Sequence, residues 1–376
     1  MLIQCTKKLL DELGIKAPPL QKGEGLFSWH ANLFYYNRRK TMVMVNDSNR
    51  YVIVLHGLKK RDFEHLDELI PAAIKSVFQD ECIDEAIIDE YLRRAGEVVF
   101  TRTTDKSSIS RVVKAGENVS FYSRGLAGGD IIQGELSRRI SRLLIGTGQG
   151  GTDYTFPHLD LMEDLEELRG GPVVKCRAAV MKVRLDLDNF DVWRQLVIPL
   201  NFTFGRLHDV LQIAFGWRDY HLHEFFIYGE KGPVDWYYIN HPAFHKEGYK
   251  PVLNLVCAEE DLKTSSATEQ RLDRAVRLAE VPFKIAKYNY DFGDDWQHYI
   301  VVEKVIDDHV VNHPVCLDGS GDAPPEDVGG EMGYALFVEA MADKNHPEHE
   351  NCREWIGGLS LDKFDLAEVN RRFLFV

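Results

Sequence analysis

Apolar and polar positions in the first half of the chain recur with two different periods, which separate predicted strands from predicted helices. Two β-rich runs, 41–45 and 51–55, flank the turn residues 46–49 and predict a hairpin. The other elements predicted here are helices at 66–78, 84–94 and 131–144 and a strand at 98–101. This mixture predicts an α+β domain.

The second half opens with extended runs at 173–187 and 193–199, followed by a helix that begins at Thr203 and ends at Gly216. Alternation over 221–226 predicts a strand that places His221 and His223 on one face. The remaining predicted elements are a hairpin of 284–292 and 296–305 with its turn at 293–295, and a C-terminal helix with a capping box formed by Asp365 and Glu368.

A domain boundary is predicted where an acidic helical stretch ends at Gly170-Gly171-Pro172, because such residues stop a helix. We therefore expect two domains, 1–168 and 173–376, each a mixed sheet packed with helices. The glycine-rich segment 146–152 is predicted to be a plain loop, because it lacks the Lys-Ser/Thr of a phosphate-binding loop.

The composition indicates in which cellular compartment the protein is expected. No apolar run approaches the roughly 20 residues that span a bilayer, and Lys7 and Lys8 interrupt any signal-peptide core. Six separated cysteines form no Cys-x-x-Cys pair, which favours reduced, buried thiols. These features predict a cytoplasmic protein without a membrane partner.

The net charge of −14 is concentrated in the second half, where 22 lysines and arginines face 34 acidic residues after position 172. Such acidity disfavours non-specific binding to nucleic acid. One basic cluster, Arg38-Arg39-Lys40, lies near Trp29 and the aromatic run 34–36, as in single-stranded nucleic-acid surfaces. The alternative is that these aromatics are core residues and the cations a solvated strand end.

Histidines and carboxylates in the second half could bind a divalent metal ion. His208 on the predicted helix would join His221 and His223 as ligands. Asp291 and Asp294 could complete the set. Alternatively, His208 is a core-edge residue, the strand histidines His221 and His223 bond buried carboxylates, and the aspartates form a hairpin turn, a common use of Asp.

The segment Pro324-Pro325-Glu326-Asp327 presents two adjacent carboxylates on a stiff loop. Glu326 could act as general base for a metal-bound water, with Asp327 and His298 as further catalytic candidates. Equally, these carboxylates could cap local amides or bind Arg194.

Three motifs in this half resemble those of the plasmid pRiA4b ORF-3-like family. They are Leu207-His208-x-x-Leu211-Gln212-x-Ala214-Phe215-Gly216-Trp217-x-x-x-His221-Leu222-His223-x-Phe225, Tyr288-x-Tyr290-Asp291-Phe292-Gly293-Asp294-x-Trp296-x-His298, and Pro324-Pro325-Glu326-Asp327-x-Gly329-Gly330-x-x-Gly333-Tyr334, with the tail His346-Pro347-Glu348-His349. The first 167 or so residues resemble a separate bacterial family of unknown function, through Cys5-Thr6-Lys7-Lys8-Leu9-Leu10, Trp29-His30-Ala31-Asn32-Leu33 and Arg38-Arg39-Lys40.

The resemblance implies an α+β fold with a mixed sheet and a plasmid or mobile-element setting, without an established reaction. Relatives often carry cysteines around the Pro-Pro-Glu-Asp motif, where this chain keeps only Cys316. Three functions remain as hypotheses: a binding or interaction protein, a metal-assisted hydrolase or nuclease, and a nucleic-acid-binding adaptor acting through the N-terminal domain.

Overall fold

The computed structural model describes the chain except for residues 17–22, 104, 123–125, 127–128, 147–152, 233–242, 263–267 and 358–362. It divides the chain into two compact units, Met1–Lys175 and Cys176–Val376. Of the predicted glycine-rich loop, only Gly146 lies within the described residues. None of the described helices is both long and apolar enough to cross a membrane.

The first unit is built on a five-stranded mixed sheet in the order β4-β3-β2-β1-β5. Its strands are β1 (Leu2–Cys5), β2 (Ser28–Tyr36), β3 (Arg39–Asn46), β4 (Val52–Leu58) and β5 (Val99–Arg102). β1 runs parallel to β2 and β5, whereas the β2–β3 and β3–β4 pairs are antiparallel. The predicted hairpin is therefore confirmed as β3 and β4.

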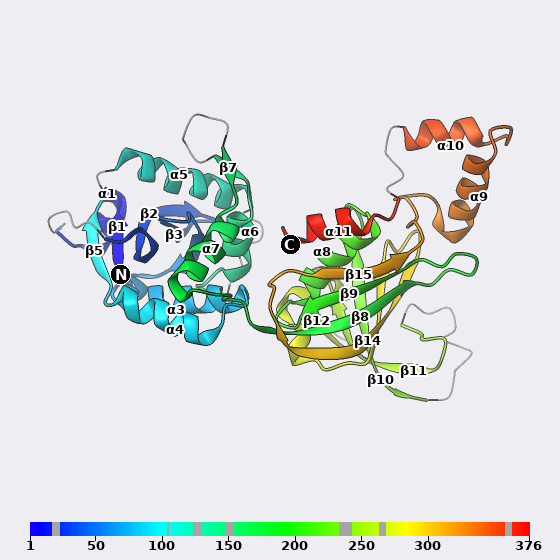
Figure 1. Cartoon of the computed structure of the whole chain (residues 1–376), viewed down its shortest axis with the longest axis horizontal. Helices are drawn as coiled ribbons and strands as arrows, with labels where there is room; N and C mark the ends of the chain where they lie inside the picture. Colours follow the sequence, from blue (N-terminus) through cyan, green and yellow to red (C-terminus); the bar gives the residue numbers. More distant parts are fainter. Residues whose placement is uncertain are drawn as a thin grey trace. The chain divides into compact units, whose positions relative to one another are not determined.

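Helices cover both faces of this sheet (Figure 1). They are α1 (Lys7–Leu13), α2 (Lys60–Phe63), α3 (Leu66–Asp80), α4 (Glu85–Ala95), α5 (Lys106–Phe121), α6 (Gly134–Ser141) and α7 (Pro157–Arg169). α3 and α4 pack into one apolar cluster and α5 and α6 into another. A short pair, β6 (Ile145–Gly146) and β7 (Tyr154–Thr155), follows α6.

Two elements of this unit differ from the sequence-based expectation. The helix predicted over 131–144 begins only at Gly134, because Ile132 forms a bridge with Leu55 of β4. Helix α5 was missed because its buried positions are small, as at Ala115 and Gly116. Its start could have been found, since the Asp105 side chain caps the backbone N–H groups of residues 107 and 108.

The second unit contains an eight-stranded sheet in the order β12-β11-β10-β13-β14-β8-β9-β15. The strands are β8 (Cys176–Leu185), β9 (Trp193–Pro199), β10 (His223–Lys231), β11 (Tyr249–Val256), β12 (Glu269–Leu272), β13 (Ile285–Tyr290), β14 (Trp296–His309) and β15 (Val315–Ser320). Among the described strands of this sheet, only β11 and β12 pair in parallel. Two mixed sheets packed with helices confirm the predicted α+β class.

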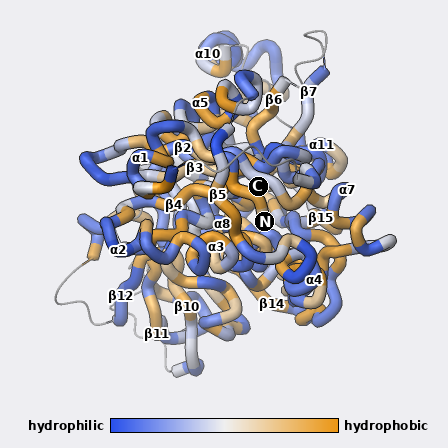
Figure 2. Tube along the Cα trace, turned by 90° about the vertical axis from the view of Figure 1, so that its left-hand side faces the viewer, coloured by the Kyte–Doolittle hydropathy of each residue, from blue (hydrophilic) through white to orange (hydrophobic). Residues whose placement is uncertain are grey.

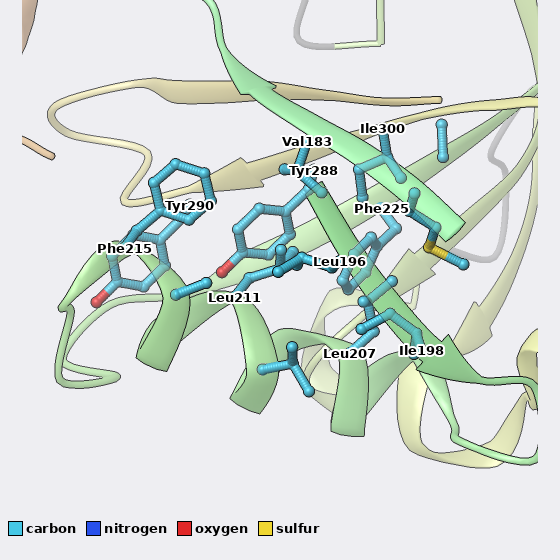
Figure 3. Close-up of a cluster of buried hydrophobic side chains, with 14 of the residues drawn as sticks. Val183, Leu196, Ile198, Leu207, Leu211, Phe215, Phe225, Tyr288, Tyr290 and Ile300 are labelled. Carbon is cyan, nitrogen blue, oxygen red and sulfur yellow. The ribbon is translucent and has the colours of Figure 1, made fainter. Parts of the chain in front are cut away.

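One helix, α8 (Phe204–Phe215), supplies the largest part of the packing on this sheet. Its Leu207, Leu211 and Phe215 meet Phe225, Tyr288 and other strand residues in one buried cluster (Figure 3). The other helices are α9 (Gly330–Ala342), α10 (His349–Ile356) and α11 (Leu366–Phe373). Apolar and polar residues alternate along the helices (Figure 2), as expected for elements that bury one face.

The ends of α8 follow the predicted signals. The Thr203 hydroxyl accepts a hydrogen bond from the backbone N–H of Arg206, and Gly216 adopts the left-handed conformation with φ 76°. We expect Thr203→Ala to lower the free energy of unfolding by about 1 kcal/mol, the usual cost of losing such a cap. Urea denaturation measures the change, and Thr203→Ser, which keeps the hydroxyl, should retain most of the stability.

Strand β10 begins later than predicted. His221 precedes it, whereas His223 is its first residue, so the two side chains do not share a strand face. A left-handed Asp219 (φ 57°) turns the chain after α8. The backbone N–H of Asp291 then donates to the carbonyl of Leu222, which directs this segment toward the β13–β14 turn.

Candidate metal centre

Three loops of the second unit meet at the beginning of β10. They are the α8–β10 connection, the β13–β14 turn and the loop that precedes α9. The Arg218 N–H donates to Glu326 Oε1 over 2.8 Å, and the Gly329 N–H donates to Asp294 Oδ2 over 3.0 Å. Hydrogen bonds therefore tie the loop before α9 to both of the others.

The side chains of His221, Asp291 and Glu326 converge where these loops meet. One ligand atom from each lies within 4.8 Å of the other two. His221 Nε2 lies 3.4 Å from Asp291 Oδ2 and 3.8 Å from Glu326 Oε2. The carboxylate of Asp327, which is 65% exposed, approaches the same nitrogen to 3.1 Å. One imidazole and two carboxylates thus form the cluster, and a third carboxylate, that of Asp327, approaches the imidazole.

Two atoms of this cluster are buried without a hydrogen bond. Within the described part of the chain, His221 Nε2 and Glu326 Oε2 have no hydrogen-bond partner. A buried polar atom left in that state costs roughly 1–3 kcal/mol, and more when it is charged. The geometry therefore leaves unsatisfied ligand atoms pointing at a common position.

The other oxygen of each buried carboxylate is held by the protein. Glu326 Oε1 accepts hydrogen bonds from Tyr290 Oη (2.9 Å) and from the Arg218 N–H. Asp291 Oδ1 accepts from the N–H groups of Gly293 and Asp294 at 3.0 and 3.3 Å. Partners of this kind orient the ligands of metal sites in proteins.

Tyr290 keeps its proton and acts as a donor. Burial, followed by the nearby Glu326 carboxylate, raises the pKa of Tyr290 well above its ordinary value. Its oxygen accepts a hydrogen bond from the Tyr220 N–H over 3.1 Å. The phenol therefore links the α8–β10 connection to Glu326.

Left-handed backbone conformations cluster at the site. Asp291, Asp295 and Asp327 have φ angles of 53°, 58° and 58°. Aspartate visits this region more readily than bulkier residues do, and such residues gather at functional sites. Asp291 therefore fits both predicted roles, because its Oδ1 shapes the hairpin turn and its Oδ2 faces the candidate site.

Asp294 is not part of the three-residue cluster, and its Oδ2 accepts a hydrogen bond from the Gly329 N–H. Arg194 forms no hydrogen bond or ion pair with Glu326 or Asp327 in the described structure. Its guanidinium donates instead to the carbonyl oxygens of Ala214, Trp193 and Ser320.

The structure divides the three predicted histidine ligands between two groups. His208 and His223 stack with ring centroids 3.5 Å apart, away from the cluster that holds His221. His208 Nε2 lies 3.0 Å from Asp219 Oδ1, and its Nδ1 lies 2.8 Å from Tyr288 Oη. Burial is the main cause that lowers the pKa of His208.

The stacked pair is satisfied by protein groups. Gln212 Nε2 donates to Tyr288 Oη, which leaves the phenol proton for His208 Nδ1 and the Nε2 proton for Asp219. His223 Nε2 bonds Asp273 Oδ2 over 2.8 Å. His208 with Asp219 and His223 also has metal-ligand spacing. However, both ring nitrogens of His208 already have protein partners. The bond from His223 to the buried Asp273 matches the alternative considered for the strand histidines.

His298 lies in the aromatic core, packed against Phe215, Trp217 and Tyr288. Burial lowers its pKa to about 3. A histidine with a lowered folded-state pKa stabilises the fold fully above its unfolded pKa of about 6.5 and progressively less as the pH falls toward 3. The structure therefore gives His298 a role in packing.

We expect this burial to appear in the pH dependence of stability. Between pH 7 and 4.5 the native protein should lose about 3 kcal/mol more unfolding free energy than the His298→Leu variant does. This difference corresponds to about 1.36 kcal/mol per pH unit below pH 6.5. Denaturant unfolding at both pH values measures it. Equal losses in the two proteins would show that His298 is not buried as a neutral base.

The predicted nucleic-acid cluster lies at the β2–β3 turn of the first unit. Arg38 and Arg39 are exposed, whereas Lys40 forms an ion pair with Glu12. Trp29 is fully buried. Tyr35 is exposed, with the Lys8 ammonium 4.9 Å from its ring centre.

Sequence reasoning missed Tyr290 as a partner of Glu326 and the two carboxylates, Asp219 and Asp273, that bond His208 and His223. Only the left-handed turn at Asp219 and the long-range pairing of Asp273 bring these groups into place. No local pattern in the chain signals either contact.

Residues 177–372 match the family model described as plasmid pRiA4b ORF-3-like protein. Residues 2–159 match the model of a domain of unknown function, DUF6933. The second match covers the part of the chain that resembles a separate bacterial family. The chain belongs to the plasmid pRiA4b ORF-3-like family.

Two relatives are themselves without assigned function. The uncharacterized protein y4hQ of Sinorhizobium fredii is 32% identical over 187 residues, which cover 49% of this chain and 84% of that protein. A crystal structure of a protein of unknown function from Methanosarcina mazei Go1 is similar with 27% identity and a TM-score of 0.40, over 51% of this chain and 97% of that chain.

Proposed function

We propose that the second unit binds a divalent metal ion through His221, Asp291 and Glu326, and that the metal centre supports hydrolysis. One observation carries the proposal: two buried ligand atoms, His221 Nε2 and Glu326 Oε2, lack hydrogen bonds and face the same point as Asp291 Oδ2. A cation there would satisfy all three atoms at once.

The ligand types favour a borderline or hard metal. Imidazole suits zinc, iron, copper and nickel, whereas carboxylates suit magnesium and manganese, so a mixed set fits manganese, iron or zinc. A metal bound there would lower the pKa of a coordinated water. Asp327, the most exposed carboxylate of the group, would accept the proton of that water. Glu326 then serves as a ligand, and the role of base passes to its neighbour.

Elemental analysis of the full chain, purified without chelator or affinity metal, tests the proposal. We expect close to one transition-metal ion per chain, and its loss in Glu326→Gln. Glu339→Gln is the matched control, because Glu339 is exposed on α9. Metal-free protein that also takes up no added Mn²⁺ would contradict the proposal. That outcome would favour the binding-protein hypothesis.

The Tyr290 hydroxyl offers a graded test of the same site. Since partners outside the ligand shell contribute roughly 10–100-fold to metal affinity, Tyr290→Phe should weaken Mn²⁺ binding by about that factor. Calorimetric titration measures the dissociation constant. Tyr299→Phe is the control, because Tyr299 lies on the opposite face of the sheet from Tyr288 and Tyr290.

A further inference from the structure

The first unit contains a cavity, whereas the proposed metal centre belongs to the second unit. The cavity has a volume of about 420 Å³ and lies over β3 and β4, where α5 approaches the end of α6. This size falls within the roughly 300–1,000 Å³ typical of small-molecule sites. Neither the family matches nor the proposed metal chemistry accounts for it.

Most of the wall of this cavity is apolar. Val45 and Val52 come from the β3–β4 hairpin, Ala115 from α5, and Ile140 and Leu143 from α6 and the residues after it. Four of these five side chains belong to the buried cluster on this face of the sheet, and Leu143 packs against it. The cavity can therefore hold the hydrocarbon or ring portion of a ligand.

The lining also includes cations from two different elements. Arg50 lies in the β3–β4 turn, and Arg111 and Lys114 lie on α5. Lys114 is paired with Glu117 at 3.1 Å, and Arg50 Nη1 donates to the carbonyl of Gly146 over 2.8 Å. Arg111 has no hydrogen-bond or ion-pair partner among the residues that the structure describes.

The two guanidinium groups repel each other. Burial first, and then the charge of Arg111, lower the pKa of Arg50, whereas Asp160 acts in the opposite direction. Two like charges beside an apolar cavity are stabilised by an anion placed between them. Planar guanidinium groups bind carboxylate, sulfonate or phosphate oxygens with two hydrogen bonds.

We propose that this cavity binds a small amphipathic anion, with its acidic group between Arg50 and Arg111 and its apolar body against Val45, Val52 and Ile140. The site is independent of the metal centre.

Fluorescence titration of the full chain with 8-anilinonaphthalene-1-sulfonate tests this site, because the probe joins aromatic rings to one anionic group. We expect one bound probe per chain. Arg111→Gln should weaken it by about tenfold, the effect of losing one charge-assisted hydrogen bond. Arg93→Gln is the control, because Arg93 is 72% exposed on α4, outside the cavity lining.

Two further measurements distinguish the contribution of the Arg111 charge to probe binding from that of the apolar cavity. N-phenyl-1-naphthylamine, which has the same rings without the sulfonate, should bind no more weakly to Arg111→Gln than to the native chain. Ala115→Phe, which fills the cavity, should remove sulfonate binding; if this variant shows no cooperative thermal unfolding, Arg111→Gln decides alone. Equal sulfonate affinity of Arg111→Gln and Arg93→Gln, or no binding by the native chain, would overturn the proposal.

Discussion

Replacing His221 with alanine is expected to lower the Mn²⁺ affinity of the protein by at least about a hundredfold. The change removes the only nitrogen ligand of the three-residue cluster. Since partners outside the ligand shell alone contribute up to roughly a hundredfold, loss of a ligand should cost no less. Isothermal titration calorimetry measures the dissociation constant.

Mn²⁺ is a better probe than Zn²⁺ for this titration, because the chain carries six free cysteines. Thiolates prefer softer metals such as zinc, so they would compete with the proposed site for Zn²⁺ but not for Mn²⁺. His65→Ala is the matched control, because His65 is an exposed histidine of the first unit. Equal Mn²⁺ affinity in His221→Ala and His65→Ala would refute the assignment of His221.

The His221→Ala variant should fold normally. The His221 side chain is 27% exposed and precedes β10, so its removal leaves no large cavity and breaks no strand pairing. The thermal unfolding midpoint without metal should stay close to that of the native chain. Added Mn²⁺ should raise the midpoint of the native chain but not that of the variant, because a ligand stabilises only the state that binds it.

The largest effect on stability is expected in the first unit, at the buried ion pair of Glu81 and Arg142. The guanidinium binds both carboxylate oxygens, at 2.6 and 2.8 Å, and the Tyr51 hydroxyl donates to Glu81 Oε1. Glu81→Gln leaves Arg142 as a buried cation without its carboxylate partner and removes a negative charge near the buried Arg138. We expect a loss of about 3–5 kcal/mol in unfolding free energy.

A matched substitution shows whether the loss of stability is specific to the buried Glu81 or follows from replacing any glutamate. Glu90→Gln breaks the exposed pair with Arg94 and should cost no more than about 1 kcal/mol. Urea unfolding of both variants supplies the comparison. A cost for Glu81→Gln as small as that for Glu90→Gln would contradict the buried network.

The ion pair of Glu81 and Arg142 should also make the stability of the protein depend on pH. Burial alone raises the pKa of Glu81, but Arg142, together with Arg138 and the Tyr51 hydroxyl, more than offsets this and holds that pKa well below its usual range. The resulting stabilisation is fully present above the unfolded pKa of about 4.3 and is lost as the pH falls toward the folded value. Glu81→Gln should therefore show a shallower loss of stability below about pH 4.

Much of the fold could be predicted because it follows from local signals. The β3–β4 hairpin, α3, α4 and α8 are set by hydrophobic periodicity together with turn and cap residues such as Thr203 and Gly216. The start of β10 could not be predicted in this way. Alternation over 221–226 fits a strand, but only the contact between the Asp291 N–H and the Leu222 carbonyl shows that His221 lies outside it.

Long-range contacts also decide which residues form the candidate site. His221, Asp291, Glu326 and Asp327 all stand out in the sequence as groups that can bind metal or transfer protons. Their grouping depends on hydrogen bonds between distant loops, such as that from the Gly329 N–H to Asp294 Oδ2. The sequence therefore suggested the residues, whereas the loop contacts separated His221 from His208 and His223.

Anomalous diffraction from crystals of the full chain soaked in Mn²⁺ tests the metal centre most directly. We predict a single strong peak in the second unit, about 2.0–2.3 Å from His221 Nε2, Asp291 Oδ2 and Glu326 Oε2. No peak at that position, or a peak only beside His208 and His223, would contradict the assignment.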